Sequence, residues 1–121
     1  MPPTNPNLRM PDCLFCRIIR KEIPAQIVAE TEHCLAFRDI APQAPTHVLV
    51  IPKGHVASLD GVTDPLEAGR VVLLAAELAR TLGVAESGYR VVMNTGVDGG
   101  QTVHHLHAHL LAGRPLQWPP G

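Results

Sequence analysis

The sequence predicts an α+β domain, in which a five-stranded and largely antiparallel sheet is accompanied by one main helix and a short N-terminal helix. Five short runs have the composition of strands, and one long segment has apolar residues at helical spacing. The runs do not alternate strictly with helices, as the strands of a parallel sheet do. With 121 residues, the chain is long enough for one hydrophobic core and too short for two.

The N-terminal part of the chain is expected to contain a tail and a short helix. The first eleven residues include four prolines and few side chains to bury, so we expect a flexible tail before a domain over residues 12–121. Asp12 is placed to cap a short helix that extends to Glu22. Pro24 then ends this helix, because proline cannot continue one.

The main helix is expected over residues 65–82. Asp64 suits the N-cap, Pro65 suits the first helical position, and Glu67 would complete a capping box. Apolar residues then recur at helical spacing, and Gly83 stops the run.

The five strands are expected over residues 26–30, 34–39, 47–51, 89–93 and 103–111. Turn-prone residues separate the first three, and a loop with two adjacent glycines joins the last two. Cys34, within an apolar run, is interpreted as a small buried hydrophobe.

The overall composition excludes several classes of protein. Hydrophobic residues make up 45% of the chain and charged residues 17%, which is typical of a globular domain rather than a disordered one. The formal net charge of -1 provides no basic face, so nucleic acid is not expected as a partner. No apolar run is long enough to span a membrane, and none resembles a signal peptide. Three cysteines give no complete disulfide set, and we expect a cytoplasmic protein.

Four of the seven histidines lie within residues 104–109. On a strand, side chains alternate between faces, so His105, His107 and His109 are expected on one face and the intervening apolar residues on the other. Same-face neighbours on a strand stand about 6.6 Å apart, close enough to surround one phosphate or one metal ion. The parity of His104 places it with the core-facing set, where a structural role is expected.

Two chemistries suit three histidines on one face. Neutral imidazoles can hold a zinc ion that activates water. Alternatively, one imidazole attacks phosphorus while its neighbours position and protonate the departing group. The pattern is internal and interleaved with apolar residues, which argues against an affinity tag.

The segment His105-Leu106-His107-Ala108-His109-Leu110-Leu111 resembles the signature of the histidine triad (HIT) family. Other segments resemble the Hint branch of that family, namely residues 35–40, 42–47, 51–53, 98–101 and 118–121. The similarity extends from about Asp12 to Gly121. It implies the HIT-like fold and an enzyme that cleaves the P–N bond of purine nucleoside 5′-phosphoramidates through a covalent nucleotidyl-histidine intermediate.

The resemblance also implies a role for each histidine of the site. His107 matches the nucleophile, and His109 matches the residue that contacts the phosphate and assists the leaving amine. His105 would orient the nucleophile and line the site, with His47 behind it in the same polar network. His47 is interpreted either as a proton relay or as a buried histidine with satisfied hydrogen bonds.

For the nucleotide, the resemblance implies phosphate contacts from Asn94 and Thr102, with Gln101 as a further donor. Gly99 and Gly100 would allow backbone N–H groups to turn toward the phosphate. The carboxylate of Asp39 would hold the ribose. The base would lie in a slot of apolar residues: Phe15, Ile18, Ile23, Phe37, Ile40 and Leu49. Without the resemblance, these six would be interpreted as ordinary core residues.

A structural zinc site is implied by relatives that hold the ion with two cysteines and two histidines. Here the ligands would be Cys13, Cys16, His55 and His105. The alternative is a pair of reduced cysteines that share one face of the first helix. No organic cofactor is expected.

The resemblance implies that a purine nucleotide, AMP or GMP, is the substrate or product. It also implies a homodimer in which the C-terminal tail of one chain lies near the active site of its partner. Trp118 is therefore expected on the leaving-group side. Two other functions stay open: a noncatalytic nucleotide-binding or scaffold protein, and a zinc hydrolase that uses the three-histidine face. The second lacks an evident acidic general base beside the histidines.

Overall fold

The computed structural model describes residues 12–121 and contains a five-stranded antiparallel sheet with two α-helices. The α+β prediction is confirmed. The expected flexible tail over the first eleven residues lies outside the described part of the chain. The strands are β1 (Ile27–Glu30), β2 (Cys34–Arg38), β3 (Thr46–Pro52), β4 (Tyr89–Val92) and β5 (Ala108–Ala112), in the spatial order β1-β2-β3-β5-β4. The helices are α1 (Leu14–Ile19) and α2 (Pro65–Thr81), with a 3₁₀ turn, η2 (Leu59–Gly61), ahead of α2.

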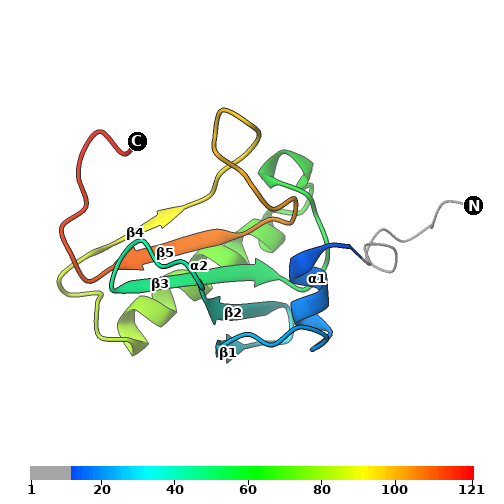
Figure 1. Cartoon of the computed structure of the whole chain (residues 1–121), viewed down its shortest axis with the longest axis horizontal. Coiled ribbons are helices and arrows are strands. Elements are labelled where there is room, and N and C mark those ends of the chain that lie inside the picture. The colour runs from blue at the N-terminus through cyan, green and yellow to red at the C-terminus, as the bar shows by residue number, and fades with distance from the viewer. Residues whose placement is uncertain (1–11) are drawn as a thin grey trace, which may run out of the picture.

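The two helices cover opposite faces of the sheet, with α2 behind the strands in Figure 1 and α1 near one end of β3. Because strand side chains alternate, Ala36 and Val48 join the core formed with α2, whereas Phe37 and Leu49 join the core formed with α1. His109 on β5 is on the sheet face that α1 covers, because its neighbours Ala108 and Leu110 belong to the core on the α2 side and side chains alternate along a strand.

Helix α2 forms where its start and stop signals predict. The Asp64 carboxylate accepts a hydrogen bond from the backbone N–H of Leu66 at 3.0 Å, and Pro65 occupies the first helical position. The helix ends at Thr81, followed by Gly83 with a φ of 75° in the left-handed region. Its buried side chains are Val71, Leu74, Ala75, Leu78 and Ala79.

Helix α1 is shorter than predicted. Cys13, rather than Asp12, is the N-cap, and its Sγ accepts a hydrogen bond from the Cys16 N–H at 3.4 Å. The helix ends at Ile19 instead of Glu22, because Lys21 adopts a left-handed φ of 63° that a right-handed helix cannot contain.

The predicted start of the last strand is wrong. Strand β5 begins at Ala108, which pairs with Val50, and residues 103–107 lie outside the sheet. The backbone N–H of Leu106 instead donates to the carbonyl of Val56 at 2.7 Å, so the segment ahead of β5 is held by another part of the chain. Consequently, His105 and His107 do not lie on a strand.

Within residues 12–121, neither helix combines the length and apolar character that a bilayer crossing requires.

Candidate active site

A cavity of about 280 Å³ opens on the sheet face that carries α1. Its polar lining comes from Asp39, Thr102, His107 and His109, together with Arg38. All six residues expected for the base slot belong to its apolar lining: Phe15, Ile18, Ile23, Phe37, Ile40 and Leu49. Leu14, Pro24, Ala25 and Val103 complete the apolar lining. Most of the six also form the buried core beneath α1, and Ile40 is fully exposed at 100%.

The ring of His107 has one nitrogen committed to the main chain. Its Nδ1 lies 2.7 Å from the carbonyl oxygen of His105, and because a carbonyl only accepts, Nδ1 carries the proton. In the neutral ring, Nε2 therefore keeps its lone pair. The ring is 5% exposed and meets the edge of Phe15 at a centroid distance of 5.2 Å. His107 thus offers an unprotonated nitrogen on a ring that lines the cavity.

His109 is joined to His47 by a directional chain of hydrogen bonds. The backbone N–H of Gln43 donates to His47 Nδ1 at 3.0 Å, so the His47 proton is on Nε2. His47 Nε2 lies 2.9 Å from His109 Nδ1 and 3.4 Å from Asp39 Oδ2. His109 Nδ1 therefore accepts, and its own proton is on Nε2. The cavity thus has a lone pair on His107 and an N–H on His109, on rings 5.0 Å apart.

Burial keeps the rings of His47 and His109 neutral near pH 7. It lowers the pKa of His47, and the Asp39 carboxylate offsets part of that shift. Burial, followed by the neighbouring His107 and His47, lowers the pKa of His109 to about 4. Neutral rings are what the assigned hydrogen-bond directions require.

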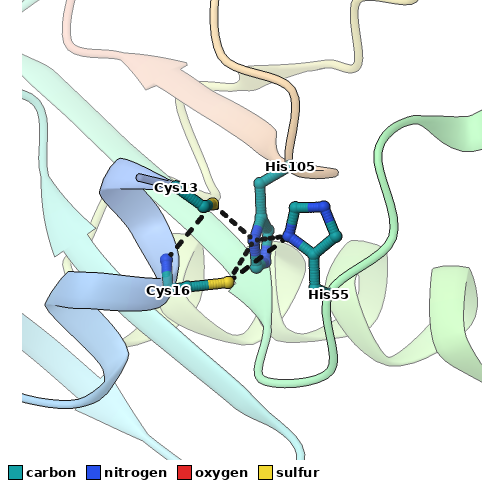
Figure 2. Close-up of side chains that lie close together, drawn as sticks. All are labelled: Cys13, Cys16, His55 and His105. Atoms are coloured by element: carbon teal, nitrogen blue, oxygen red, sulfur yellow. Dashed lines mark hydrogen bonds between the residues drawn. The ribbon is translucent and has the colours of Figure 1, made fainter. Parts of the chain in front are cut away.

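His105 faces away from the other two triad histidines. Its ring is fully buried, with Nε2 donating to the Pro52 carbonyl at 2.9 Å and Nδ1 lying between the two cysteines (Figure 2). The expectation of one shared three-histidine face is therefore wrong, because the segment ahead of β5 leaves the sheet. The structure also places His47 beside His109 rather than behind His105.

Cys13, Cys16, His55 and His105 bring their ligand atoms within 4.8 Å of one another. His105 Nδ1 lies 3.4 Å from Cys13 Sγ and 3.5 Å from Cys16 Sγ, and His55 Nδ1 lies 3.3 Å from Cys16 Sγ and 3.1 Å from His105 Nδ1. A tetrahedral zinc with bonds of about 2.3 Å to sulfur and about 2.0 Å to nitrogen puts its ligand atoms about 3.3 to 3.8 Å apart. The donor set and its spacing fit zinc.

The protonation pattern of this cluster fits a cation as well. Burial lowers the pKa of His105 to about 4, and its Nε2 proton is used on the Pro52 carbonyl, which leaves the Nδ1 lone pair toward the cysteines. Burial, followed by the neighbouring Cys13, raises the pKa of the Cys16 thiol to about 12. A thiolate at Cys16 therefore needs a nearby cation.

Asp39, His47 and His109 also lie close enough to share a metal ion. Their tautomers oppose it, because the Gln43 N–H on His47 Nδ1 places the proton on the Nε2 that would have to bind the metal. In the described part of the chain, neither metal-competent group contains all three triad histidines. The zinc-hydrolase alternative thus lacks the convergent ligands it requires.

Two phosphate donors expected from the glycine-containing loop, the Gly100 N–H and the Gln101 side chain, are engaged in other hydrogen bonds. The N–H of Gly100 donates to Val97 and that of Gln101 to Gly96, so the loop closes on itself. The Gln101 side chain donates to the carbonyls of Ala57 and Val103 and accepts from the Gly96 N–H. Gln101 therefore braces the loop, and of the expected phosphate contacts in this segment only Thr102 lines the cavity.

Asn94 and Trp118 do not line the cavity. The Trp118 side chain is 82% exposed in this chain, and the tail before it is held by Arg90, which donates to the Gln117 carbonyl at 2.9 Å.

Comparison with known proteins decides the family. The model of the HIT domain matches residues 20–116. The chain belongs to the HIT family. An uncharacterised HIT-like protein of Synechococcus elongatus is 56% identical over 112 residues, covering 91% of this chain and 97% of its own. The purine nucleoside phosphoramidase of Escherichia coli K12 is 49% identical over 107 residues, covering 87% of this chain and 90% of its own.

Solved structures of HIT proteins share the fold. A HIT family hydrolase from Legionella pneumophila Philadelphia 1 superposes with a TM-score of 0.88 at 50% identity, covering 90% of this chain and 99% of its own. A histidine triad nucleotide-binding protein from Candida albicans gives a TM-score of 0.77 at 35% identity, covering 88% of this chain and 82% of its own.

The main-chain groups that orient the histidines of this HIT domain have no signal in the sequence. The carbonyls of Pro52 and His105 and the N–H of Gln43 each fix one ring. Every residue has a carbonyl and every residue except proline has an N–H, so no side-chain pattern signals them. Among side chains, the additional cavity lining of Leu14 and Val103 carried no distinguishing signal.

Proposed function

We propose that this protein hydrolyses purine nucleoside 5′-phosphoramidates, with His107 Nε2 as the nucleophile that attacks the α-phosphate. The observation that carries the proposal is the hydrogen bond from His107 Nδ1–H to the His105 carbonyl, which leaves Nε2 unprotonated on a ring lining the cavity. The similarity to a protein named purine nucleoside phosphoramidase supports the substrate class.

The reaction takes two displacements. In the first, His107 Nε2 bonds to phosphorus, the P–N bond breaks with its electron pair on nitrogen, and that nitrogen takes the proton of His109 Nε2–H. Loss of this proton leaves His109 as an imidazolate, whose negative charge is balanced by the positive charge that forms on the adjacent His107 ring, and a departing amine anion is a base strong enough to take the proton. In the second, water attacks phosphorus, its proton returns to His109, and the Nε2–P bond breaks to give AMP.

The cavity supplies the binding groups. The apolar lining around Phe15 and Leu49 suits the flat face of a purine, and the Asp39 carboxylate at the rim suits the two ribose hydroxyls. We propose that Thr102 and His109 Nε2–H, which both line the cavity, donate to the phosphate oxygens. Adenine and guanine share this flat aromatic face, so the proposal covers both bases.

We also propose a structural zinc ion held by Cys13, Cys16, His55 and His105. When bound, it would cross-link α1 to the two segments that carry the histidines and fix the backbone of His105, whose carbonyl orients His107.

A homodimer is proposed as the working form. Among residues 12–121, β4 pairs only with β5, and α2 exposes Leu66 and Leu73 at 58% and 70%. Together with the exposed Trp118, these features favour a second copy of the chain as partner.

The test is hydrolysis of adenosine 5′-phosphoramidate by the wild type, His107→Ala and His33→Ala. His33 is an exposed histidine outside the cavity lining, with its side chain paired to Glu32, and it serves as the matched control. We expect AMP release by the wild type and by His33→Ala, and a loss of at least about a thousandfold in kcat for His107→Ala with AMP binding retained.

Activity of His107→Ala within about tenfold of wild type would refute the nucleophile. AMP binding without hydrolysis of any phosphoramidate by the wild type would favour the noncatalytic nucleotide-binding alternative.

A further inference from the structure

Gln43 is held at both of its main-chain polar groups. Its N–H donates to His47 Nδ1 at 3.0 Å, and its carbonyl accepts from Arg114 Nη2 at 2.9 Å and Nε at 3.3 Å. Arg114 follows β5 and is 71 residues away in sequence. The residue that donates to His47 therefore lies in a loop, and its carbonyl is held by the segment that follows β5. This segment, residues 113–121, is called the C-terminal arm below.

The same arm packs closely on the loop. Gly113 has a φ of 94°, and a Cβ on it would lie 2.8 Å from the Cβ of Pro45. Only glycine permits both that conformation and that approach. Beside it, Ala112 pairs with Thr46 at the start of β3. Arg114 is thus placed directly over the loop rather than on a mobile end.

We infer that Arg114 is a positioning residue of the catalytic site, which holds the Gln43 carbonyl so that the Gln43 N–H stays on His47 Nδ1 and His109 keeps its proton on Nε2. This inference rests on the proposed function. The chain of contacts is complete, because His47 Nε2 lies 2.9 Å from His109 Nδ1 and His109 lines the cavity.

Loss of Arg114 acts through the tautomers. When the Gln43 N–H moves away, His47 can carry its proton on Nδ1 and turn its Nε2 lone pair toward His109. His109 then places its own proton on Nδ1 and has none on Nε2 to give to the leaving nitrogen. Attack by His107 does not depend on this chain, because the carbonyl of His105 fixes that ring.

The kinetic test compares two substrates, AMP joined to a primary alkylamine and the p-nitrophenyl ester of AMP. An amine must be protonated to leave, whereas p-nitrophenolate need not be. In Arg114→Met we expect kcat for the amine to fall about tenfold or more, kcat for the ester to fall less than about twofold, and KM to change little. Arg114→Lys should recover part of the loss, since it keeps a cationic donor.

The control is Arg80→Met. Arg80 is an exposed arginine in the last turn of α2, on the sheet face opposite the cavity, and it is not among the residues that line the cavity. We expect its ratio of amine to ester rates to equal that of wild type. An equal loss for both substrates in Arg114→Met, or the same selective loss in Arg80→Met, would overturn the inference.

A second readout needs no substrate. With ¹⁵N-labelled histidine, NMR of the free wild-type protein should show His47 and His109 as Nε2–H tautomers, and Arg114→Met should shift both toward Nδ1–H. Unchanged tautomers would overturn the inference even if activity fell. If the protein hydrolyses no phosphoramidate, the proposed function fails while this measurement still decides the role of Arg114.

Discussion

His105, His107 and His109 have similar sequence surroundings, yet each ring has a different partner. His105 donates to the Pro52 carbonyl and faces two cysteines, His107 donates to the His105 carbonyl, and His109 accepts from His47. One ring is thereby suited to bind a metal, one to attack phosphorus and one to donate a proton. At the residue scale, chemical roles come from which nitrogen carries the proton.

Replacing Asp39 with Asn should weaken ribose recognition. The carboxylate lines the cavity, and its Oδ1 already accepts the Ala41 N–H at 2.8 Å, so an uncharged amide loses the stronger, charge-assisted bonds to the hydroxyls. We expect KM for a ribonucleotide phosphoramidate to rise about tenfold, which corresponds to about 1.4 kcal/mol. The 2′-deoxy substrate is the control and should change less. Equal losses for the two substrates would place the ribose contact elsewhere.

The neutral His109 should make stability depend on pH. Its pKa is lowered from 6.5 to about 4 by burial and by its neighbouring histidines, so below about pH 6.5 the unfolded chain binds more protons than the folded one. The stabilising contribution is therefore present above pH 6.5 and is lost as the pH falls toward 4. Thermal melts across this range should show a smaller decrease in Tm for His109→Asn than for wild type. Parallel curves would contradict a neutral His109.

Local signals predicted most elements of the fold. Asp64 and Pro65 marked the start of α2, and short apolar runs identified β2 and β3, because these features act within a few residues. The start of β5 was missed because His-Leu-His-Ala-His alternates like a strand. The bond that removes this segment from the sheet joins the Leu106 N–H to the distant Val56 carbonyl. Similarly, the closed hydrogen bonding of the glycine-containing loop could not be inferred from its composition.

Helix α1 has only six residues, too few to be stable alone, and it carries two of the four zinc ligands. We expect protein purified without a polyhistidine tag to contain about one zinc per chain. Cys13→Ser should lower the zinc content and reduce Tm by at least about 5 °C. Cys34→Ala is the matched control, since Cys34 is a buried cysteine outside the cluster, and it should keep its zinc. Absence of metal from freshly reduced wild-type protein would contradict the zinc site. It would favour the alternative, in which Cys13 and Cys16 are a pair of reduced cysteines on one face of the first helix.

The whole molecule leaves apolar surface exposed on α2 and in the C-terminal tail, which favours a dimer. Light scattering should give the mass of two 13.0 kDa chains. In the dimer, Trp118 is expected near the partner's leaving-group side. Removal of residues 118–121 should therefore change the relative rates for different amines more than the affinity for AMP. A monomer, or unchanged relative rates after truncation, would contradict this arrangement.

The covalent role of His107 is tested most directly by the stereochemistry at phosphorus. An AMP phosphoramidate made chiral with sulfur at the α-phosphorus would be hydrolysed in ¹⁸O-labelled water, and the configuration of the product determined. Two successive in-line displacements, first by His107 Nε2 and then by water, each invert the centre and give overall retention. The product is therefore expected to show retention of configuration. Inversion would show that water attacks phosphorus directly and would contradict the nucleotidyl-histidine intermediate.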